Sequence, residues 1–506
     1  MKLGFTALVD RYGIALVQAL RVESEIGKTR VSRESNGHTA NKYPPSYQPT
    51  DDFAGHFEFG LKYEEIHIEF FARLFAATGP GPIEAWCREA PFGQYARRTG
   101  FLYEWLTGEL LDVPDVSNGG YVDAISSQCY LTRTEFVRNR RWRINDNLPG
   151  TAAFCPLVRR TEIVQEALLF DLDAALGALH QAFGADILMR TASWLTFKES
   201  RASFLIEKEA DKTDRVQRFA YVIAKHCGHI EDPLSSNSLH TLQAGILGHD
   251  AVGLGLRRSP VFVGQSTMRE DIVHYVGPNF ETLPQLLEGL SAFEAATRGA
   301  EPLARAAVIA FAFVYIHPMR DGNGRIHRFL VNDTLIRDRA LPDGVILPVS
   351  ATITSSVDFR VRYDRTLEAF SRPLMQRYAA SYRFGDLVHY EDGTSSNLIF
   401  DDYKDALFAW RYPDLTEHVL YTAQVVAHTV RKEMADEAQV LVMFQRAQTQ
   451  LKDVLEMPDQ DANRVIRSLK ENGWQVSGKL KKAYPQLDDS ARAERVVEAV
   501  RSAFEG

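Results

Sequence analysis

The segment Ile316-His317-Pro318-Met319-Arg320-Asp321-Gly322-Asn323-Gly324-Arg325-Ile326-His327-Arg328 carries the clearest structural signature in this sequence. An apolar run at residues 306–316 precedes it and follows Pro302, a residue favoured in the first turn of a helix. The run is shorter than the roughly 20 residues that cross a bilayer. Apolar residues recur at helical spacing toward the end of the segment and beyond it: Ile326, Phe329, Leu330 and Leu335. We therefore expect two buried helices joined by a short loop.

The expected loop has the properties of an anion site. Gly322 and Gly324 can adopt backbone conformations that other residues resist, so successive N–H groups can turn inward. The same groups lie at the amino end of the second helix, where unpaired donors and the helix dipole favour a phosphate. Arg325 and Arg328 are three residues apart on one helix face, so both guanidinium groups can reach one polyphosphate.

Two further side chains supply the loop with a possible metal ligand and a possible base. Asp321 is an oxygen ligand beside the expected phosphate site, and proteins commonly hold Mg²⁺ with one or two carboxylates plus substrate oxygens. His317 can accept a proton near neutral pH. Each feature alone is common in ordinary turns and helix ends. Their combination at fixed offsets predicts a nucleotide site with a general base.

The pattern His-x-x-x-Asp-Gly-Asn-Gly-Arg-x-x-Arg, from His317 to Arg328, resembles the signature of Fic domains, most of which transfer AMP from ATP to a protein hydroxyl. Met319 stands where that family usually has Phe, and because Met is an adaptable apolar side chain we expect it to anchor the loop equally well. The resemblance covers roughly residues 193–382 and implies a Fic-type helical core. Gly324 favours AMP transfer, since the phosphate-transferring branch that resembles Doc toxins usually has Lys there.

The resemblance implies a role for each position of the pattern. His317 would be the general base for a target Ser, Thr or Tyr, and Asp321 would bind Mg²⁺ on the phosphates of ATP. The remaining positions would hold the α-, β- and γ-phosphates: Gly322, Asn323, Gly324, Arg325 and Arg328. These roles suit phosphoryl-type chemistry, which depends mainly on positioning and on stabilising charge over the phosphate oxygens.

A helix expected over residues 193–208 contains Ser203 and Glu207, which are four apart and share a face. Many Fic proteins carry an inhibitory helix with Ser or Thr four residues before a Glu that pairs with the second motif arginine, here Arg328. The resemblance therefore implies that Glu207 occupies the space of the γ-phosphate. Lys208 departs from the Gly or Asn usual at the next position, and an ordinary helix face would give the same spacing.

A short strand signal lies ahead of the catalytic helix. Val261, Phe262 and Val263 are β-forming residues that Gly264 follows. In the resembling family a β-hairpin flap at this place aligns the target segment by strand addition. We therefore expect residues 261–264 to dock an extended protein substrate through main-chain hydrogen bonds, with a plain surface hairpin as the alternative.

Composition sets the wider limits. The chain has 506 residues, a formal net charge of −8 and four cysteines without paired spacing, so it favours a reducing, cytoplasmic compartment and gives no overall attraction for nucleic acid or membrane. We expect a helical region over residues 1–185 with a loop or disordered stretch at 22–57, a Fic domain over 186–385, and a helical unit over 386–506. The expected fold class is predominantly all-α.

The carboxyl-terminal region suggests a second class of function. Arg464, Arg467 and Lys470 lie on a predicted helix, and a hairpin-like stretch follows at 473–480. A helix followed by a hairpin would form a winged helix whose basic helix enters the DNA major groove. The alternative function is therefore a DNA-binding regulator with a subsidiary Fic-like core. The basic cluster at 138–143 could also bind single-stranded nucleic acid, although such arginines commonly pair with carboxylates.

The leading prediction is a Mg²⁺-dependent protein adenylyltransferase that is inhibited by Glu207 and can modify itself. Removal of AMP, or transfer of another phosphate-containing group such as UMP or phosphocholine, would use the same motif and stays open at this stage. The target protein, its modified residue and the formation of a homodimer also stay open.

Overall fold

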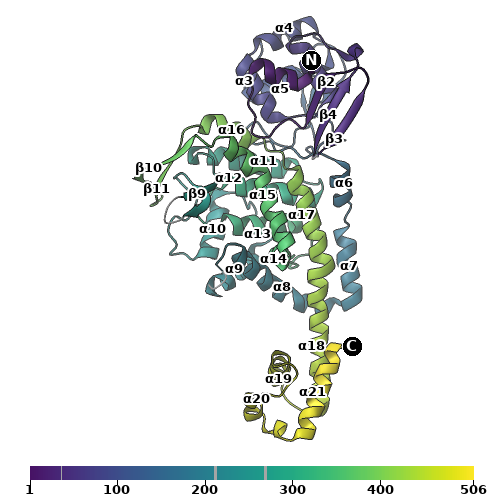
Figure 1. Cartoon of the computed structure of the whole chain (residues 1–506), viewed down its shortest axis with the longest axis vertical. Coiled ribbons are helices and arrows are strands. Elements are labelled where there is room, and N and C mark those ends of the chain that lie inside the picture. Colours follow the sequence, from purple (N-terminus) through teal and green to yellow (C-terminus); the bar gives the residue numbers. More distant parts are fainter. Residues whose placement is uncertain (36, 210–212, 267–270, 506) are drawn as a thin grey trace.

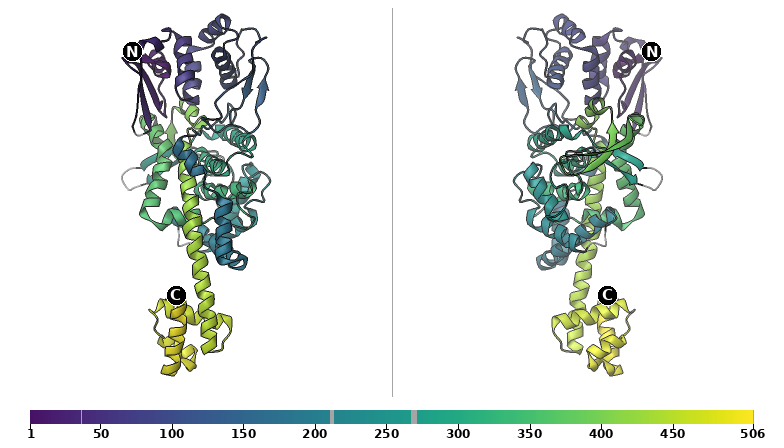
Figure 2. Two further views of the ribbon diagram at one scale, coloured as in Figure 1. Left: turned by 90° about the vertical axis from the view of Figure 1, so that its right-hand side faces the viewer. Right: turned by 90° about the vertical axis from the view of Figure 1, so that its left-hand side faces the viewer.

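The computed structural model describes residues 1–35, 37–209, 213–266 and 271–505 (Figure 1). An amino-terminal unit, a helical core and a small carboxyl-terminal unit follow one another along the longest axis of the molecule, as two further views also show (Figures 1 and 2). One long helix connects the core to the last unit and comprises α17 (Thr416–His428), the π-helical η3 (Thr429–Met434) and α18 (Ala435–Val454). Helices dominate, which confirms the predicted all-α fold class.

The amino-terminal unit combines short helices with two small sheets. The helices are α1 (Gly4–Tyr12), η1 (Pro45–Tyr47), α2 (Phe53–Tyr63), α3 (Ile68–Thr78), α4 (Gly81–Glu89) and α5 (Gln94–Thr107). One sheet has the order β1 (Lys2–Leu3), β2 (Val22–Ile26), β4 (His38–Tyr43) and β3 (Val31–Ser35), and the other the order β5 (Val122–Asp123), β7 (Ile144–Asp146) and β6 (Val137–Asn139).

Residues 22–57, which the sequence predicts as a loop or disordered stretch, therefore contain three strands and the start of α2. The prediction is wrong because these strands are polar: every side chain of β3 is exposed, and only Val22 and Ser24 of β2 are buried. Backbone pairing holds them, with β2 parallel to β4 and β3 antiparallel to β4. Such pairing leaves little trace in hydrophobic periodicity.

The basic cluster at 138–143 is used within the fold. Trp142 is buried, and its indole N–H donates to the Glu104 carboxylate at 2.7 Å. Arg141 pairs with Glu104 at 2.9 Å and with Asp115 at 2.5 Å. The Trp142 ring is therefore inaccessible for stacking, and Arg141 pairs with carboxylates, as the alternative reading of this cluster predicts.

The core is built around one antiparallel pair of helices, α12 (Pro302–Ile316) and α13 (Asn323–Arg337). Helix α12 is buried on nearly every side, and α13 buries Arg325, Arg328 and Asp333 together with its apolar residues. The surrounding helices are α6 (Glu162–Leu168), α7 (Leu172–Phe183), α8 (Ala185–Ile206), α9 (Thr213–His226), α10 (Ser236–Leu247), η2 (Phe280–Thr282), α11 (Leu283–Ala296), α14 (Val349–Ser355), α15 (Val357–Arg377) and α16 (Tyr403–Arg411). Across the described ranges, no helix combines the length and hydrophobicity that a bilayer span requires.

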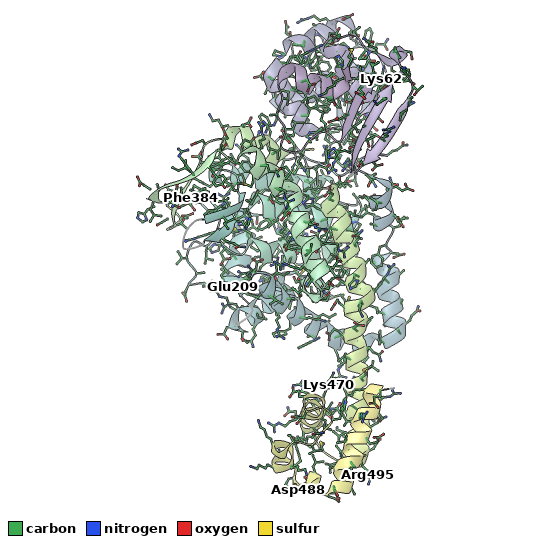
Figure 3. The ribbon with its side chains drawn as sticks, viewed as in Figure 1. Lys62, Glu209, Phe384, Lys470, Asp488 and Arg495 are labelled. Atoms are coloured by element: carbon green, nitrogen blue, oxygen red, sulfur yellow. The ribbon has the colours of Figure 1, made fainter. Side chains whose placement is uncertain are left out.

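Two antiparallel hairpins project from the core. The predicted one comprises β8 (Phe262–Ser266) and β9 (Asp271–Val276). The second, β10 (Tyr382–His389) with β11 (Ser395–Phe400), lies where the sequence predicts the start of a helical unit. The two hairpins contact each other through Phe262 and Phe384, whose ring centroids are 5.4 Å apart. Phe384 is labelled in Figure 3.

The carboxyl-terminal unit is helical throughout its described residues. Helix α18 packs against α19 (Asp459–Glu471) and α21 (Ser490–Glu505), with α20 (Gly478–Ala483) and η4 (Pro485–Asp488) between them. The predicted hairpin at 473–480 is wrong, because Ser477 caps the amino end of α20 by accepting from the Leu480 N–H. Lys470, labelled in Figure 3, lies over the Phe444 and Phe504 rings. The unit is therefore not a winged helix.

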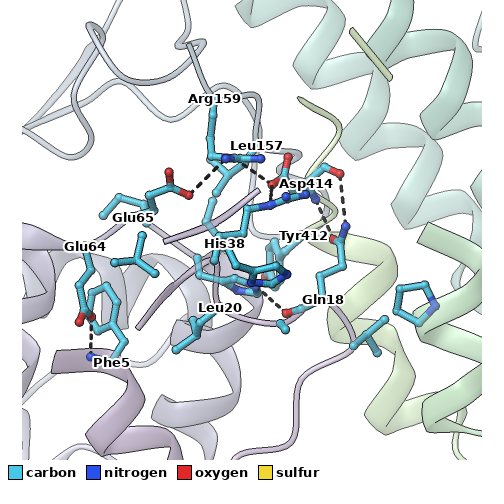
Figure 4. Close-up of a pocket in the computed structure, with 18 of the residues that line it drawn as sticks. Phe5, Gln18, Leu20, His38, Glu64, Glu65, Leu157, Arg159, Tyr412 and Asp414 are labelled. Atoms are coloured by element: carbon cyan, nitrogen blue, oxygen red, sulfur yellow. Dashed lines mark hydrogen bonds and ion pairs between the residues drawn. The ribbon is translucent and has the colours of Figure 1, made fainter. Parts of the chain in front are cut away.

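A cavity of about 390 Å³ lies where the amino-terminal unit meets the core (Figure 4). Asp414 accepts hydrogen bonds there from Arg21 at 3.3 Å and from Arg159 at 3.1 Å, and Gln18 bonds to the Asp414 backbone. Because these groups pair across the boundary, the cavity belongs to the junction between the two units. The predicted domain boundaries near residues 185 and 385 stay predictions.

Candidate active site

The loop between α12 and α13 is shaped by two left-handed residues. His317 ends α12 with a φ of 48°, and Gly322 caps α13 with a φ of 92°. The Asn323 side chain closes the loop: its Oδ1 accepts from the Met319 N–H at 3.0 Å, and its Nδ2 donates to the Met319 carbonyl at 2.8 Å. Met319 is fully buried, so it anchors the loop as the sequence predicts. The Asn323 side chain is thus occupied by the loop itself and leaves its backbone N–H for a phosphate.

The orientation of the His317 ring is fixed by its own helix. Its Nδ1 lies 3.1 Å from the Val314 carbonyl, and since a carbonyl can only accept, Nδ1 carries the hydrogen and Nε2 the lone pair. Burial, followed by the positive charge of Arg257, lowers the pKa of His317 to about 4. The imidazole is therefore neutral near pH 7 and can accept a proton.

The amino end of α13 is open to an anion. No side chain caps the first turn, and the first intrahelical bond runs from Ile326 N–H to the Gly322 carbonyl. Asp321 lies beside it with a side chain 54% exposed, and its carboxylate accepts from the Gly322 N–H at 2.6 Å. Within the described ranges, the N–H groups of residues 323–325 have no hydrogen-bond partner, and such groups at the start of a helix bind phosphate.

Both motif arginines are buried at this site. Arg328 donates to the Ser203 hydroxyl at 2.8 Å and to Glu207 Oε1 at 2.6 Å, and it lies 3.4 Å from the Tyr363 hydroxyl. Arg325 stacks over the Phe204 ring, 4.7 Å from its centroid. Within the described part of the chain, the Nε and Nη1 atoms of Arg325 are buried without a hydrogen-bond partner. Buried donors without partners are costly, which suits a guanidinium that receives an anionic ligand.

The Glu207 carboxylate lies directly over the second glycine of the loop. A Cβ placed on Gly324 would collide with Glu207 Oε1, so the carboxylate fills the space above the phosphate site. Burial raises the pKa of Glu207, but the charge of Arg328 outweighs it and the net shift is downward. Glu207 is thus ionised at neutral pH and paired with Arg328.

Residues 234–335, which include this loop and both of its helices, match the family model of the Fic/DOC family. This part of the chain is similar to a Fic domain. Over 154 residues it is 30% identical to the protein adenylyltransferase fic-1 of Caenorhabditis elegans, an alignment that covers 30% of this chain and 28% of that protein. The corresponding protein of Caenorhabditis briggsae is 30% identical over 152 residues, which covers 29% and 28%. The chain thus matches less than a third of the length of these curated relatives.

A solved structure of a Fic family protein from Desulfovibrio desulfuricans G20 superposes with a TM-score of 0.39 at 17% identity. The superposition covers 56% of this chain and 79% of that one.

The segment that follows α8 contacts both arginines of the loop motif. After α8, Lys208 adopts a φ of 60°, and the Glu209 N–H donates to the Phe204 carbonyl at 2.9 Å. This turn is a Schellman motif, which normally has Gly at the left-handed position. It brings the Glu209 carboxylate, labelled in Figure 3, to within 2.9 Å of Arg325 Nη2.

The hairpin of β8 and β9 lies next to His317. Among described residues, β8 pairs with β9 alone, so one edge of β8 is unpaired. Val263 is 42% exposed on this strand, Phe262 packs against the second hairpin, and Val261 precedes the strand. A Cβ on Gly277, after β9, would lie 3.6 Å from His317 Cβ. The predicted docking strand therefore begins at 262 and is rooted beside the imidazole.

Sequence reasoning missed four residues of the site. Arg257 donates to the His317 carbonyl, Gln243 donates to the Asp321 carbonyl at 2.8 Å, Tyr363 contacts Arg328, and Glu209 pairs with Arg325. Glu209 had a signal, because it is a second carboxylate two residues beyond Glu207. The other three lie far from the motif in sequence and have no local pattern that singles them out.

Proposed function

We propose that this chain is a protein adenylyltransferase, which transfers AMP from ATP to a Ser, Thr or Tyr hydroxyl of a protein and is held inactive by Glu207. One observation carries the proposal: a neutral imidazole, an uncapped helix terminus and two buried guanidinium groups converge on one loop. The Caenorhabditis relatives named as adenylyltransferases support the same reaction. The small residue at Gly324 leaves the α-phosphate accessible once the Glu207 carboxylate moves.

In the proposed reaction, His317 Nε2 accepts the proton of the target hydroxyl. The oxygen forms a bond to the α-phosphorus as the bond to the bridging oxygen of the β-phosphate breaks, and pyrophosphate leaves. The N–H groups of residues 323–325 hold phosphate oxygens, and Arg325 and Arg328 stabilise the charge on the β- and γ-phosphates. The flap edge presents the target segment by strand addition.

Asp321 fits a magnesium ligand at this site. It offers an exposed carboxylate oxygen beside the phosphate cradle. In the described ranges no cluster of three or more His, Cys, Asp or Glu side chains could hold a metal by itself. Phosphate oxygens would complete the coordination, which is how Mg²⁺ is usually bound. When bound, the ion would neutralise charge on the phosphates.

The inhibited state rests on two ion pairs from one segment. Glu207 pairs with Arg328 at 2.6 Å, and Glu209 pairs with Arg325 at 2.9 Å. ATP must displace both carboxylates before its phosphates can pair with both arginines. The apparent affinity for ATP is therefore reduced by the fraction of molecules in which the segment is displaced.

Intact-mass measurement after incubation with ATP and Mg²⁺ tests the proposal. We expect Glu207→Gly to gain the mass of one or more AMP groups at a rate roughly tenfold or more above the parent chain. Glu207→Gly combined with His317→Ala should gain none, because the base is missing. A Glu207→Gly protein that binds ATP but acquires no AMP, or a His317→Ala protein that still does, would falsify the assignment.

A further inference from the structure

Arg257 is a buried cation beside the candidate general base. It is 2% exposed, and its guanidinium donates to three backbone carbonyls: His317 at 2.8 Å, Ser259 at 2.8 Å and Pro278 at 2.7 Å. Its own N–H donates to the Pro318 carbonyl at 2.9 Å. Burial lowers the pKa of Arg257 to about 10, which still leaves it charged at neutral pH. A buried charge bonded only to carbonyls is costly, so its position calls for a reason.

The three carbonyls belong to three structural parts that must act together. His317 is the left-handed residue whose backbone aims the imidazole. Ser259 precedes β8 and Pro278 follows β9, so they form the two roots of the flap. One side chain thus bonds to the base and to both ends of the element that docks the target.

A second contact connects the flap to the catalytic helix independently of Arg257. The Tyr275 hydroxyl on β9 donates to the Tyr315 carbonyl in the last turn of α12, and Trp410 donates to the Tyr275 oxygen at 3.0 Å. The flap strand is therefore held to α12 even when the Arg257 contacts are removed. What Arg257 adds is the link from the flap roots to His317 itself.

We propose that Arg257 is a positioning residue that sets the register between the target hydroxyl on the flap and Nε2 of His317. This inference rests on the proposed function and adds to it the device that aligns base and substrate. A peptide paired with the edge of β8 takes its position from the flap roots. Since Arg257 bonds to those roots and to the base, the hydroxyl and the imidazole stay aligned without any side-chain recognition of the target.

Besides burial, the charge of the Arg257 guanidinium also lowers the pKa of His317. Among the described residues, Arg257, ahead of the flap, disfavours the protonated form of the imidazole, and Glu207, at the end of α8, favours it. Replacing Arg257 with a neutral residue should raise the pKa of His317. The base needs its neutral form, so the acid side of the pH–rate profile should move to higher pH.

The test uses the full chain with Glu207→Gly as the parent, so that inhibition does not mask the rate. Arg257→Gln and Arg257→Lys are compared with Arg298→Gln, which changes an exposed arginine outside the site. We measure AMP incorporation against pH, ATP affinity by calorimetry and the melting temperature. For Arg257→Gln we expect a rate lowered about tenfold to a hundredfold, because small misplacements of reacting groups have effects of this size. ATP affinity should stay unchanged and the acid limb should move to higher pH.

Arg257→Lys keeps the charge but not the planar fork that reaches three carbonyls. It should restore the pH profile without restoring the rate, and it carries the test if Arg257→Gln fails to fold. An Arg257→Gln protein with the rate and pH profile of the parent overturns the inference. If the parent transfers no AMP at all, the proposed function fails instead. The inference is then judged by NMR titration of the His317 ring, and an unchanged pKa in Arg257→Gln overturns it.

Discussion

At the scale of single residues, the site is a set of opposite charges buried together. Arg325 and Arg328 are both nearly inaccessible, and each has its carboxylate partner in the segment after α8. Removing one partner of a buried ion pair strongly destabilises the fold, because the other charge is left uncompensated. Each pair is therefore stable as it stands and yet replaceable by an anion of equal or greater charge, such as a polyphosphate.

We predict that Glu209→Gln raises self-modification in the chain that retains Glu207. The change removes one carboxylate from Arg325, which keeps Asp321 at 3.3 Å, and leaves Glu207 on Arg328, so the effect should be smaller than that of Glu207→Gly. The double variant should exceed both. Incorporation of labelled AMP measures this, with Glu471→Gln, an exposed carboxylate on α19, as the control. A Glu209→Gln rate equal to that of the control would limit inhibition to Glu207 alone.

At the scale of elements, helix α8 combines a firmly packed middle with an end that we propose to be inhibitory. Its last turn closes in the Schellman motif at Lys208, where a side chain strains the left-handed backbone. Eight residues before Glu207, Glu199 is buried and accepts from the Ser350 N–H at 2.7 Å and from its hydroxyl at 2.5 Å. The middle of α8 is therefore bonded to α14 while its end carries the strain.

We predict that Lys208→Gly strengthens inhibition. Glycine adopts the left-handed conformation freely, so the closed turn should gain about 1 kcal/mol relative to Lys. Basal self-modification should fall about fivefold, the factor that corresponds to this energy. Lys208→Ala keeps the strain and should match the parent, which makes it the control. Equal rates for the Gly and Ala variants would show that the strained turn does not limit activation.

The contact between Glu199 and Ser350 should make stability depend on pH. Burial raises the pKa of Glu199 to about 7, above its value in the unfolded chain. The stability that the protonated carboxyl contributes to the fold is therefore present at low pH and is lost as the pH rises through 7. We expect Glu199→Gln, which stays neutral, to be more stable than the parent at pH 8 by on the order of 2 kcal/mol and to match it near pH 5. Melting temperatures across this range measure the difference, and a difference that does not change with pH would contradict it.

At the scale of the whole molecule, the long helix contacts α8 on its way to the carboxyl-terminal unit. Lys198 of α8 pairs with Glu433 at 3.0 Å and with Glu437 at 2.5 Å, on either side of the junction between η3 and α18. Figure 2 shows this helix running from the core to the separate terminal unit. A force on the terminal unit would therefore reach α8 through these pairs.

We predict that Lys198→Ala raises basal self-modification by no more than about fivefold, because partly exposed ion pairs contribute at most about 1 kcal/mol. The gain should disappear at high salt, where the parent pairs are screened too. Lys432→Ala removes an exposed pair on the same long helix and serves as the control. A Lys198→Ala rate equal to that of this control at low salt would show that the Lys198 ion pairs do not couple α8 to the long helix.

The amino-acid sequence alone was sufficient for the elements with strong local patterns. Short-range chemistry accounts for the apolar run of α12, the glycines of the loop, the buried Met319, the spacing of Ser203 and Glu207, and the strand signal at residues 261–263, where the observed strand begins at Phe262. Each depends on residues within a few positions of one another. Helical periodicity and turn preferences act over that range, so they were readable.

Only the tertiary structure decided the rest. Arg257 reaches His317 across 60 residues of chain and Arg325 meets Glu209 across 116, and these contacts depend on packing that no local pattern encodes. The polar strands β2 to β4 and the second hairpin form by backbone pairing, while Ser477 turns the expected wing into a helix. The motif thus specified the chemistry of the loop, and the fold determined which distant charges restrain it, because hydrogen bonds between remote segments exist only once the chain has packed.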